Sequence, residues 1–205
     1  MPDNKNPYHH GDLRTALLEA ALSIITESGP QALTIREVAR RAGVSHAAPY
    51  RHFADKDELI LAVVEQGFAL MQATMTTAKS QAEQEPLAQF AASGMAYIDF
   101  ALEYPAYYRV MYSGDLLSST GQQSLQHTSA DTFKDLISDV QTCQQLNIIR
   151  PGDPAKQALA LISMVHGFVT LANDNRIAAL LGENYPLAEI RNTIMSAIFE
   201  GIGTQ

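Results

Sequence analysis

The 205-residue sequence contains a single cysteine, Cys143, and no tryptophan. One thiol cannot form an intramolecular disulfide framework, so the composition fits a reducing compartment. The longest apolar run, residues 158–172, spans about 15 residues and is interrupted by Ser163, His166 and Thr170, which makes it too short for a membrane span. The first residues also lack the apolar core of a signal peptide. We therefore expect a cytoplasmic protein without a membrane partner.

Motifs of the common enzyme classes are missing as well. The sequence has no glycine-rich phosphate loop, no His-Glu-x-x-His, no Gly-x-Ser-x-Gly and no paired cysteine ligands. The adjacent His9 and His10 do not converge on one ion, and no further ligands are suitably spaced. No strand pattern is present, whereas apolar residues recur at helical spacing along most of the chain. These patterns predict an all-α protein without a catalytic site, a metal or a cofactor.

Basic residues are in the minority, since 14 lysines and arginines face 22 aspartates and glutamates, and the formal net charge is −8. Taken alone, this balance argues against nucleic acid and would suit many enzymes. The distribution is uneven, however, because residues 1–56 carry 7 basic and 6 acidic side chains, whereas the rest carries 7 and 16. A near-neutral head on an acidic body can place one face on phosphates while the body stays off the duplex.

Residues 34–53 have the pattern of two short helices joined by a tight turn. The segment opens with Thr-x-x-Glu at 34–37, the spacing of a capping box at a helix start. Gly43 suits a left-handed turn after the first helix, and Ser45 suits the N-cap of the second. We expect this second helix to run for about two turns to the end of the segment, because Pro49 in its first turn forfeits only about one hydrogen bond.

The second helix suits a DNA major groove, because its leading residues are small and its trailing residues carry hydrogen-bond donors. A bare helix-turn-helix pattern also occurs in proteins that do not contact DNA. Here Gly-Val-Ser at 43–45, Tyr-x-His-Phe at 50–53 and Asp-Lys-Asp-Glu-Leu at 55–59 agree at once. Together these elements resemble the DNA-binding domain of the TetR, or tetracycline-repressor-like, family over roughly residues 12–68.

The resemblance implies an N-terminal three-helix head, a helical regulatory body, about nine helices in all and a two-fold dimer. Residues 1–11 are expected to form a flexible arm, with Asp12 as the N-cap of the first helix. Residues 12–68 are the expected DNA-binding domain, and residues 69–205 are the expected ligand-binding and dimerisation domain. Later helices are expected at about 55–79, 87–103, 106–112, 125–146, 155–173, 177–181 and 186–201.

The last two long helices are strongly apolar, which suggests a helix-pair interface with a second copy of the chain. In the resemblance, these helices form a four-helix bundle across a two-fold axis, although they could also simply fill the core of one chain. A two-fold dimer would place two recognition helices about 34 Å apart and read a palindromic operator with half-sites one duplex turn apart.

Position by position, the resemblance implies phosphate contacts through the hydroxyls of Thr34 and Tyr50 and through Lys56. Arg36 is expected to reach a base edge or a backbone oxygen, and His46 is the candidate for a base-specific hydrogen bond. Many relatives have Lys-Gly-Thr where this chain has His-Ala-Ala, so the base preference cannot be carried over. The full expected DNA-binding set is Thr34, Arg36, Ser45, His46, Ala47, Ala48, Tyr50, Arg51, His52 and Lys56.

The body resembles the subset of the family with a Trp-x-x-x-His-Gly signature in the penultimate helix, although this chain has His166 and Gly167 without a tryptophan. Aromatic and methionine side chains in the body could line a pocket for a small apolar or amphipathic effector. At helical spacing, such side chains also suit a plain core. The candidates are Phe90, Met95, Phe100, Tyr104, Tyr107, Tyr108, Met111, Met164, His166 and Phe168.

The sequence thus predicts a transcriptional regulator, by resemblance a repressor, that a small-molecule effector releases from a palindromic operator. A helical protein-interaction adaptor without DNA binding is the main alternative, and an all-α enzyme is a weaker one. The effector, the operator sequence and the regulated genes do not follow from the sequence. Cys143 suits a small apolar position or, without a resolving partner, an isolated oxidant-sensitive thiol.

Overall fold

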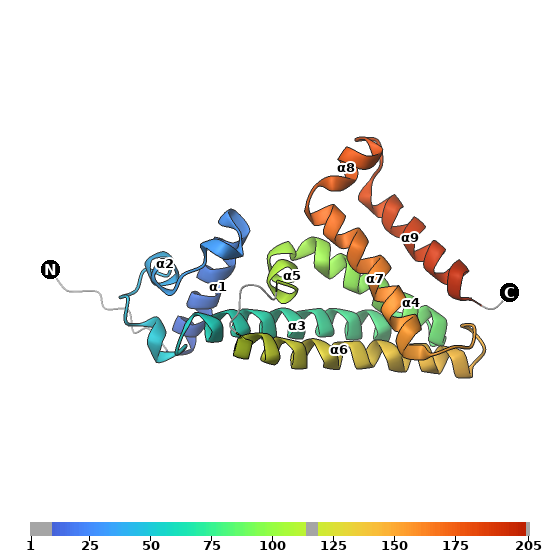
Figure 1. Cartoon of the computed structure of the whole chain (residues 1–205), viewed down its shortest axis with the longest axis horizontal. Coiled ribbons are helices and arrows are strands. Elements are labelled where there is room, and N and C mark those ends of the chain that lie inside the picture. Colours follow the sequence, from blue (N-terminus) through green and yellow to red (C-terminus); the bar gives the residue numbers. More distant parts are fainter. Residues whose placement is uncertain (1–9, 114–118, 204–205) are drawn as a thin grey trace. The chain divides into compact units, whose positions relative to one another are not determined.

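The computed structural model describes residues 10–113 and 119–203, without the side chains of residues 10–12, 119–120, 124–128 and 131. Within these ranges the chain is helical, and its single β-bridge, between Ile149 and Gly203, is isolated (Figure 1). The predicted all-α fold is therefore confirmed. The helices in chain order are α1 (His10–Ser28), η1 (Pro30–Ala32), α2 (Ile35–Arg41), η2 (Pro49–Arg51), α3 (Lys56–Gln81), α4 (Pro86–Glu103), α5 (Pro105–Met111), α6 (Ser119–Gln145), α7 (Pro154–Asn173), α8 (Arg176–Leu181) and α9 (Leu187–Ile202).

Two helices begin earlier than the sequence pattern predicts. α1 begins at His10, so Asp12 lies in its first turn and the predicted N-cap at that residue is wrong. α6 begins at Ser119, six residues before the predicted start at 125. In both cases the additional residues are polar, and apolar periodicity therefore does not mark them as helical. Residues 1–9 of the predicted arm lie outside the described residues.

The chain divides into two compact units. One holds the described residues up to Gly67 together with those of Ala106–Gln126, and the other holds Phe68–Pro105 and His127–Gln205. The division falls within α3, within α6 and at the start of α5, so α3 and α6 each contribute residues to both units.

The core of the first unit lies where α1, α2 and the beginning of α3 meet. Its apolar side chains recur every three or four residues, and each contributes roughly 1.5–3 kcal/mol relative to an exposed position. α5 also belongs to this unit and approaches α3 closely at Gly67, where an added Cβ would lie 2.8 Å from the Met111 sulfur. The fully buried members include Leu17, Ile24, Ile25, Leu33, Val38, Phe53, Leu59 and Val63.

Helices α4, α7 and α9 pack together in the second unit. Phe90 of α4 meets Phe199 of α9 edge-to-face, with ring centroids 5.9 Å apart. The Asn173 side chain at the end of α7 donates to the Ala101 carbonyl of α4 at 3.1 Å. Elsewhere in this unit, α3 and α6 run in the same direction, and Lys79 Nζ lies 2.5 Å from an Asp139 carboxylate oxygen.

Helices α3 and α7 are long and apolar enough, by length and composition alone, to cross a membrane. Core helices of soluble proteins pass the same test, and 44% of the apolar window of α3 and 33% of that of α7 are buried within the chain. Two such helices are therefore weak evidence for a membrane protein.

Candidate nucleic-acid interface

Helix α2 begins at the predicted cap. Thr34 has extended backbone angles, and its hydroxyl oxygen accepts from the Glu37 N–H at 3.1 Å. The other half of the predicted capping box is replaced, because the Glu37 carboxylate accepts from Arg40 Nε at 2.8 Å and from Nη2 at 2.6 Å. The Thr34 hydroxyl still has its proton to donate, so a phosphate contact remains compatible with the cap.

Helix α2 ends in a Schellman motif. The Gly43 N–H donates to the Arg40 carbonyl at 3.2 Å, and the Val44 N–H donates to the Ala39 carbonyl at 3.0 Å. Gly43 has φ +70°, the left-handed conformation that the sequence predicts for this position. The chain therefore leaves α2 in a direction fixed by two hydrogen bonds and one glycine.

We expect Gly43→Ala to lower the free energy of unfolding by about 1 kcal/mol, because an L side chain in the left-handed region costs roughly that amount. Urea denaturation would measure the loss. Gly43→Asn is the matched control and should lose less, since asparagine tolerates this conformation. No atom of the described residues lies within 4 Å of the position that an added Cβ would take, so a steric clash is not the expected cause. Equal losses for both variants would contradict the backbone explanation.

The predicted two-turn helix after this glycine is wrong, and so is the predicted N-cap at Ser45. The segment is a turn followed by a single 3₁₀ turn, η2, whose N-cap is Ala48 without a side-chain bond. Most of its backbone bonds span three residues, including those from the Ala48 N–H to the Ser45 carbonyl and from the His52 N–H to the Pro49 carbonyl, each at 2.9 Å. At the end of the turn, the Phe53 N–H also reaches the Pro49 carbonyl at 3.0 Å. Pro49 has no N–H for the α-helical bond to Ser45, and its buried ring holds the tighter turn in place.

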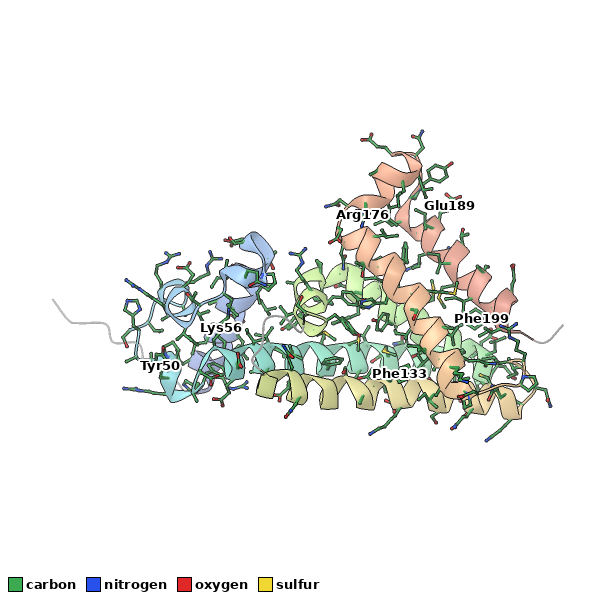
Figure 2. All side chains as sticks on the ribbon, viewed as in Figure 1. Tyr50, Lys56, Phe133, Arg176, Glu189 and Phe199 are labelled. Atoms are coloured by element: carbon green, nitrogen blue, oxygen red, sulfur yellow. The ribbon has the colours of Figure 1, made fainter. Side chains whose placement is uncertain are left out.

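Most of the predicted DNA-binding side chains lie at the surface of the first unit. Tyr50 on η2 has 59% of its surface exposed, and Lys56 occupies the first position of α3 (Figure 2). Ala48 and Lys56 are half-buried. The exposed members of the predicted set are Thr34, Arg36, Ser45, His46, Ala47, Tyr50 and Arg51.

His52 is less accessible than a phosphate contact requires. Its Nε2 is buried and has no hydrogen-bond partner among the described residues. Its ring lies beside that of Phe53, with centroids 6.4 Å apart, and Arg14 of α1 lies over the Phe53 ring at 5.5 Å. In this conformation a phosphate contact by His52 could use only Nδ1. The Arg14 contact is a link between elements that no local spacing rule predicts.

Helix α3 begins with a variant of the capping box. The Glu58 N–H donates to an Asp55 carboxylate oxygen at 2.9 Å, and the Ala54 N–H donates to a Glu58 carboxylate oxygen at 2.5 Å. The first half of a capping box is therefore present, whereas the Glu58 carboxylate binds the amide of Ala54 rather than that of the N-cap Asp55. The box places Lys56 in the first turn of α3, where the helix dipole also favours an anion.

The cations of this unit differ in their partners. Arg40 binds Glu37, and Arg41 lies 2.6 Å from Glu27 on α1, whereas Arg36 and Arg51 have no carboxylate partner among the described side chains. The hydrogen bonds from Arg40 lower the pKa of the Glu37 carboxyl, so this carboxylate stays ionised at neutral pH. Arg36, Arg51 and Lys56 are consequently the cations best placed to bind an external anion.

The predicted effector-pocket residues do not all fall in one unit. Tyr107, Tyr108 and Met111 belong to the first unit, and the other seven belong to the second. Met164 is 47% exposed on α7, so it does not line a closed cavity of the single chain. In the second unit, Phe90, Phe100 and Phe168 are buried, whereas Met95, Tyr104 and His166 are half-buried.

Two titratable groups of the body have shifted pKa values. Burial lowers the pKa of the half-buried His166 imidazole, which is therefore neutral at pH 7. Burial, with a smaller contribution from Asp139, raises the pKa of the Cys143 thiol, and Lys79 opposes the shift. A buried thiol with a raised pKa is a poor nucleophile, which favours the reading of Cys143 as a small apolar side chain.

Two protein-family models match the chain. The first, described as bacterial regulatory proteins of the tetR family, matches residues 17–63, which include α2, the turn and η2. The second, described as a tetracyclin repressor-like C-terminal domain, matches residues 90–189. Together the two models cover most of the chain.

Curated relatives match the N-terminal part of the chain. An HTH-type transcriptional repressor of Mycobacterium tuberculosis is 39% identical over 61 residues, which are 30% of this chain and 32% of the relative. The HTH-type transcriptional regulator BetI of Rhizobium meliloti is 43% identical over 51 residues, 25% of each chain. The matched segment thus spans about a third or less of the length of these relatives.

Solved structures match over almost the whole chain. A protein of unknown function from Rhodococcus sp. RHA1 is 32% identical with a TM-score of 0.83, and the match covers 98% of this chain and all of the other. A ketosteroid transcriptional regulator of Mycobacterium tuberculosis is 18% identical with a TM-score of 0.70, covering 94% of this chain and 95% of the other. The second likeness concerns the fold alone.

Proposed function

Because the chain belongs to the TetR family of bacterial regulatory proteins, we propose that it is a cytoplasmic DNA-binding transcriptional regulator that acts as a repressor. One observation carries the proposal: the segment that matches the first family model presents largely exposed residues between two capped helices, α2 and α3. We call residues 44–53, which include η2, the recognition turn. Repression is supported by the Mycobacterium tuberculosis relative that is named a repressor. The proposal includes no catalytic activity.

The recognition turn is proposed to enter the major groove of duplex DNA. Ser45, His46 and Ala47 are exposed and short enough for the backbone to approach base edges, and His46 can donate or accept a hydrogen bond there. The hydroxyls and cations on either side are proposed to bind phosphates and so to fix the orientation of the turn. These flanking residues are Thr34, Arg36, Tyr50, Arg51 and Lys56.

The proposed assembly is a homodimer through α7 and α9, with residues 12–68 as the DNA-binding domain and residues 69–205 as the dimerisation and ligand-binding domain. Two features of α7 support it: Leu159 and Met164 are exposed apolar side chains, and Gly167 lies on the same exposed side with open space around it. Two copies related by a two-fold axis would suit a palindromic operator with half-sites one duplex turn apart.

The proposed regulator responds to a small apolar or amphipathic effector bound among the aromatic and methionine side chains of the body. The neutral imidazole of His166 would offer such a ligand one polar contact without a charge. Effector binding is proposed to act through α3, one of the helices whose residues fall in both units. A coupling of roughly 1–3 kcal/mol would weaken operator binding about 5- to 150-fold.

The experiment that tests the proposal is selection from a random duplex library by the full-length chain. A regulator of this kind should enrich a palindrome whose half-sites are centred about one helical turn apart. The enriched duplex is called the selected duplex below. A protein-interaction adaptor should enrich no sequence and bind no duplex even at low ionic strength, and that result would refute the proposal.

Two substitutions should separate phosphate contacts from base contacts. Tyr50→Phe removes one hydroxyl donor and should weaken binding to all duplexes alike, about threefold to tenfold per protomer. His46→Ala should instead relax the preference at one base pair of each half-site, by about 1–3 kcal/mol. Fluorescence anisotropy with the selected duplex and its single-base variants would measure both effects.

Tyr185→Phe is the matched control, because Tyr185 is also exposed but lies in the second unit. It should leave affinity and base preference unchanged. Identical binding profiles for Tyr50→Phe and His46→Ala would contradict the proposed division of roles.

A further inference from the structure

Arg41, the last residue of α2, takes part in a closed network with two residues of α1. Its Nη1 lies 2.6 Å from a Glu27 carboxylate oxygen and donates to the Ser23 hydroxyl oxygen at 2.7 Å. The Ser23 hydroxyl in turn donates to the same Glu27 oxygen at 3.0 Å. We call Ser23, Glu27 and Arg41 the Arg41 network. Eighteen residues separate Ser23 from Arg41, so the network joins two elements rather than two turns of one helix.

The guanidinium is directed inward over the end of α1. The Arg41 side chain is 25% exposed, whereas the neighbouring Arg40 side chain is 66% exposed. A second carboxylate oxygen, from Glu37, lies 4.0 Å from Arg41 Nη2. The hydrogen bond from Arg41, followed by that from Ser23, lowers the pKa of the Glu27 carboxyl, so the network stays charged at neutral pH.

The position of Arg41 in α2 determines what the network can control. The two hydrogen bonds of the Schellman motif follow directly, from the amides of Gly43 and Val44, and the exposed His46 comes two residues later. A rotation of the last turn of α2 would therefore redirect the recognition turn. Fixing the end of α2 against α1 fixes the direction in which that turn begins.

We infer that Arg41 is a positioning residue for DNA recognition rather than a phosphate contact. The Arg41 network holds the end of α2 on α1, so that the turn after Gly43 presents His46 in one orientation. The inference rests on the proposed DNA-binding function. According to this inference, the acidic residue Glu27 favours DNA binding, although DNA is itself a polyanion.

Two substitutions distinguish a positioning role from an effect of side-chain charge alone, because the two explanations predict different DNA affinities. Glu27→Gln removes a negative charge, so charge alone predicts equal or tighter DNA binding, whereas positioning predicts weaker binding. Arg41→Lys keeps the positive charge, so charge alone predicts no change. Positioning predicts weaker binding, because one ammonium cannot replace both Nη1, which contacts Glu27 and Ser23, and Nη2, which lies 4.0 Å from Glu37.

A positioning role predicts that both variants lose affinity for the selected duplex by about fivefold per protomer. This loss corresponds to the upper end of the range for one exposed ion pair. Affinity for a scrambled duplex of the same length and the dependence of log affinity on log salt should stay as in the wild type. Glu19→Gln is the matched control, since Glu19 is an exposed carboxylate on the same helix and has no ion pair among the described residues. It should bind the selected duplex as tightly as the wild type or more tightly.

Hydrogen exchange of the DNA-free chain supplies an independent readout. The amides of Gly43 and Val44 should exchange about threefold to fivefold faster in Glu27→Gln and Arg41→Lys than in the wild type or in Glu19→Gln. A network that only stabilises α1 would leave these amides, and the ratio of selected to scrambled affinity, unchanged.

The outcomes distinguish failure of the inference from failure of the proposed function. Suppose that the wild-type chain binds the selected duplex, that Glu27→Gln binds it like Glu19→Gln, and that Arg41→Lys binds it like the wild type. This result would overturn the positioning role alone. A fall of about 0.9 in the salt slope for each lost contact in Arg41→Gln would show that Arg41 binds phosphate, and would also overturn it. A wild-type chain that binds no duplex would overturn both.

Discussion

The affinity of the full-length chain for the selected duplex should fall about 10³-fold when monovalent salt rises from 50 to 200 mM. Arg36, Arg51 and Lys56 of each protomer flank the residues proposed to enter the major groove and have no carboxylate partner among the described side chains, whereas Arg40 and Arg41 are paired. A dimer would thus neutralise about six phosphates and give a slope of log affinity against log salt of roughly −5. Anisotropy titrations at several salt concentrations would measure the slope.

Substitution of Arg36, Arg51 and Lys56 together by glutamine should bring that slope close to zero and abolish measurable binding at 200 mM salt. Arg40→Gln is the matched control, because it removes one positive charge that Glu37 already binds at 2.6 Å. It should leave the slope unchanged. A wild-type slope near −9 would contradict this assignment, since it would mean that the paired arginines also release counterions, about ten per dimer. A flat plot would contradict DNA binding altogether.

Local motifs were predictable from the sequence because their partners lie three or four residues apart. The Thr34 cap, the left-handed Gly43 and the box between Asp55 and Glu58 each depend on one side chain meeting a nearby backbone group. The 3₁₀ form of the recognition turn was not predicted. There the missing N–H of Pro49 competes with the helical tendency of its neighbours, and burial of the proline ring decides the outcome.

Contacts between distant elements could not be read from spacing. The Arg41 network joins the end of α2 to the end of α1, and Arg14 reaches Phe53 across nearly forty residues of sequence. Charged residues at these positions look like ordinary surface residues in the sequence. Only the packing of α1 against α2 and against Phe53 reveals that Arg41 and Arg14 have partners on distant elements.

The body shows a different limit of sequence patterns. An apolar side chain at helical spacing is compatible both with a core and with a ligand pocket, because both remove it from water. Phe90 packs edge-to-face against Phe199 and is part of the core, whereas Met164 is exposed on α7. The spacing that predicted both residues as pocket candidates cannot make this distinction.

The exposed face of α7 supports the proposed dimer more directly than the apolar content of the whole helix does. Its members recur every three or four residues on one side of the helix and are small or apolar, so a second helix could approach closely. A charged solvent-facing helix would show a different composition. The face consists of Leu159, Ala160, Ser163, Met164, Gly167 and Thr170.

Gly167→Arg should convert the dimer to monomers and weaken binding to the selected duplex about 10²- to 10⁴-fold, the gain that linking two binding modules provides. Within the part of the chain that the structure describes, nothing lies within 4 Å of an added Cβ at this position, and replacing a mid-helix glycine favours the helix by up to about 1 kcal/mol. The substitution therefore acts on the partner helix rather than on the fold. Analytical ultracentrifugation would report the mass, and circular dichroism would report the retained helix.

Ala73→Arg on the exposed side of α3 is the matched control for charge and bulk, and it should remain dimeric. Leu159→Glu, at a residue that is 58% exposed, provides a second test of the same face and should also yield monomers. In both monomeric variants the salt slope should fall to about half of the wild-type value, because one protomer brings half of the phosphate contacts. A dimer that survives both substitutions would place the interface elsewhere, and a monomer with an undiminished slope would contradict two-fold recognition of DNA.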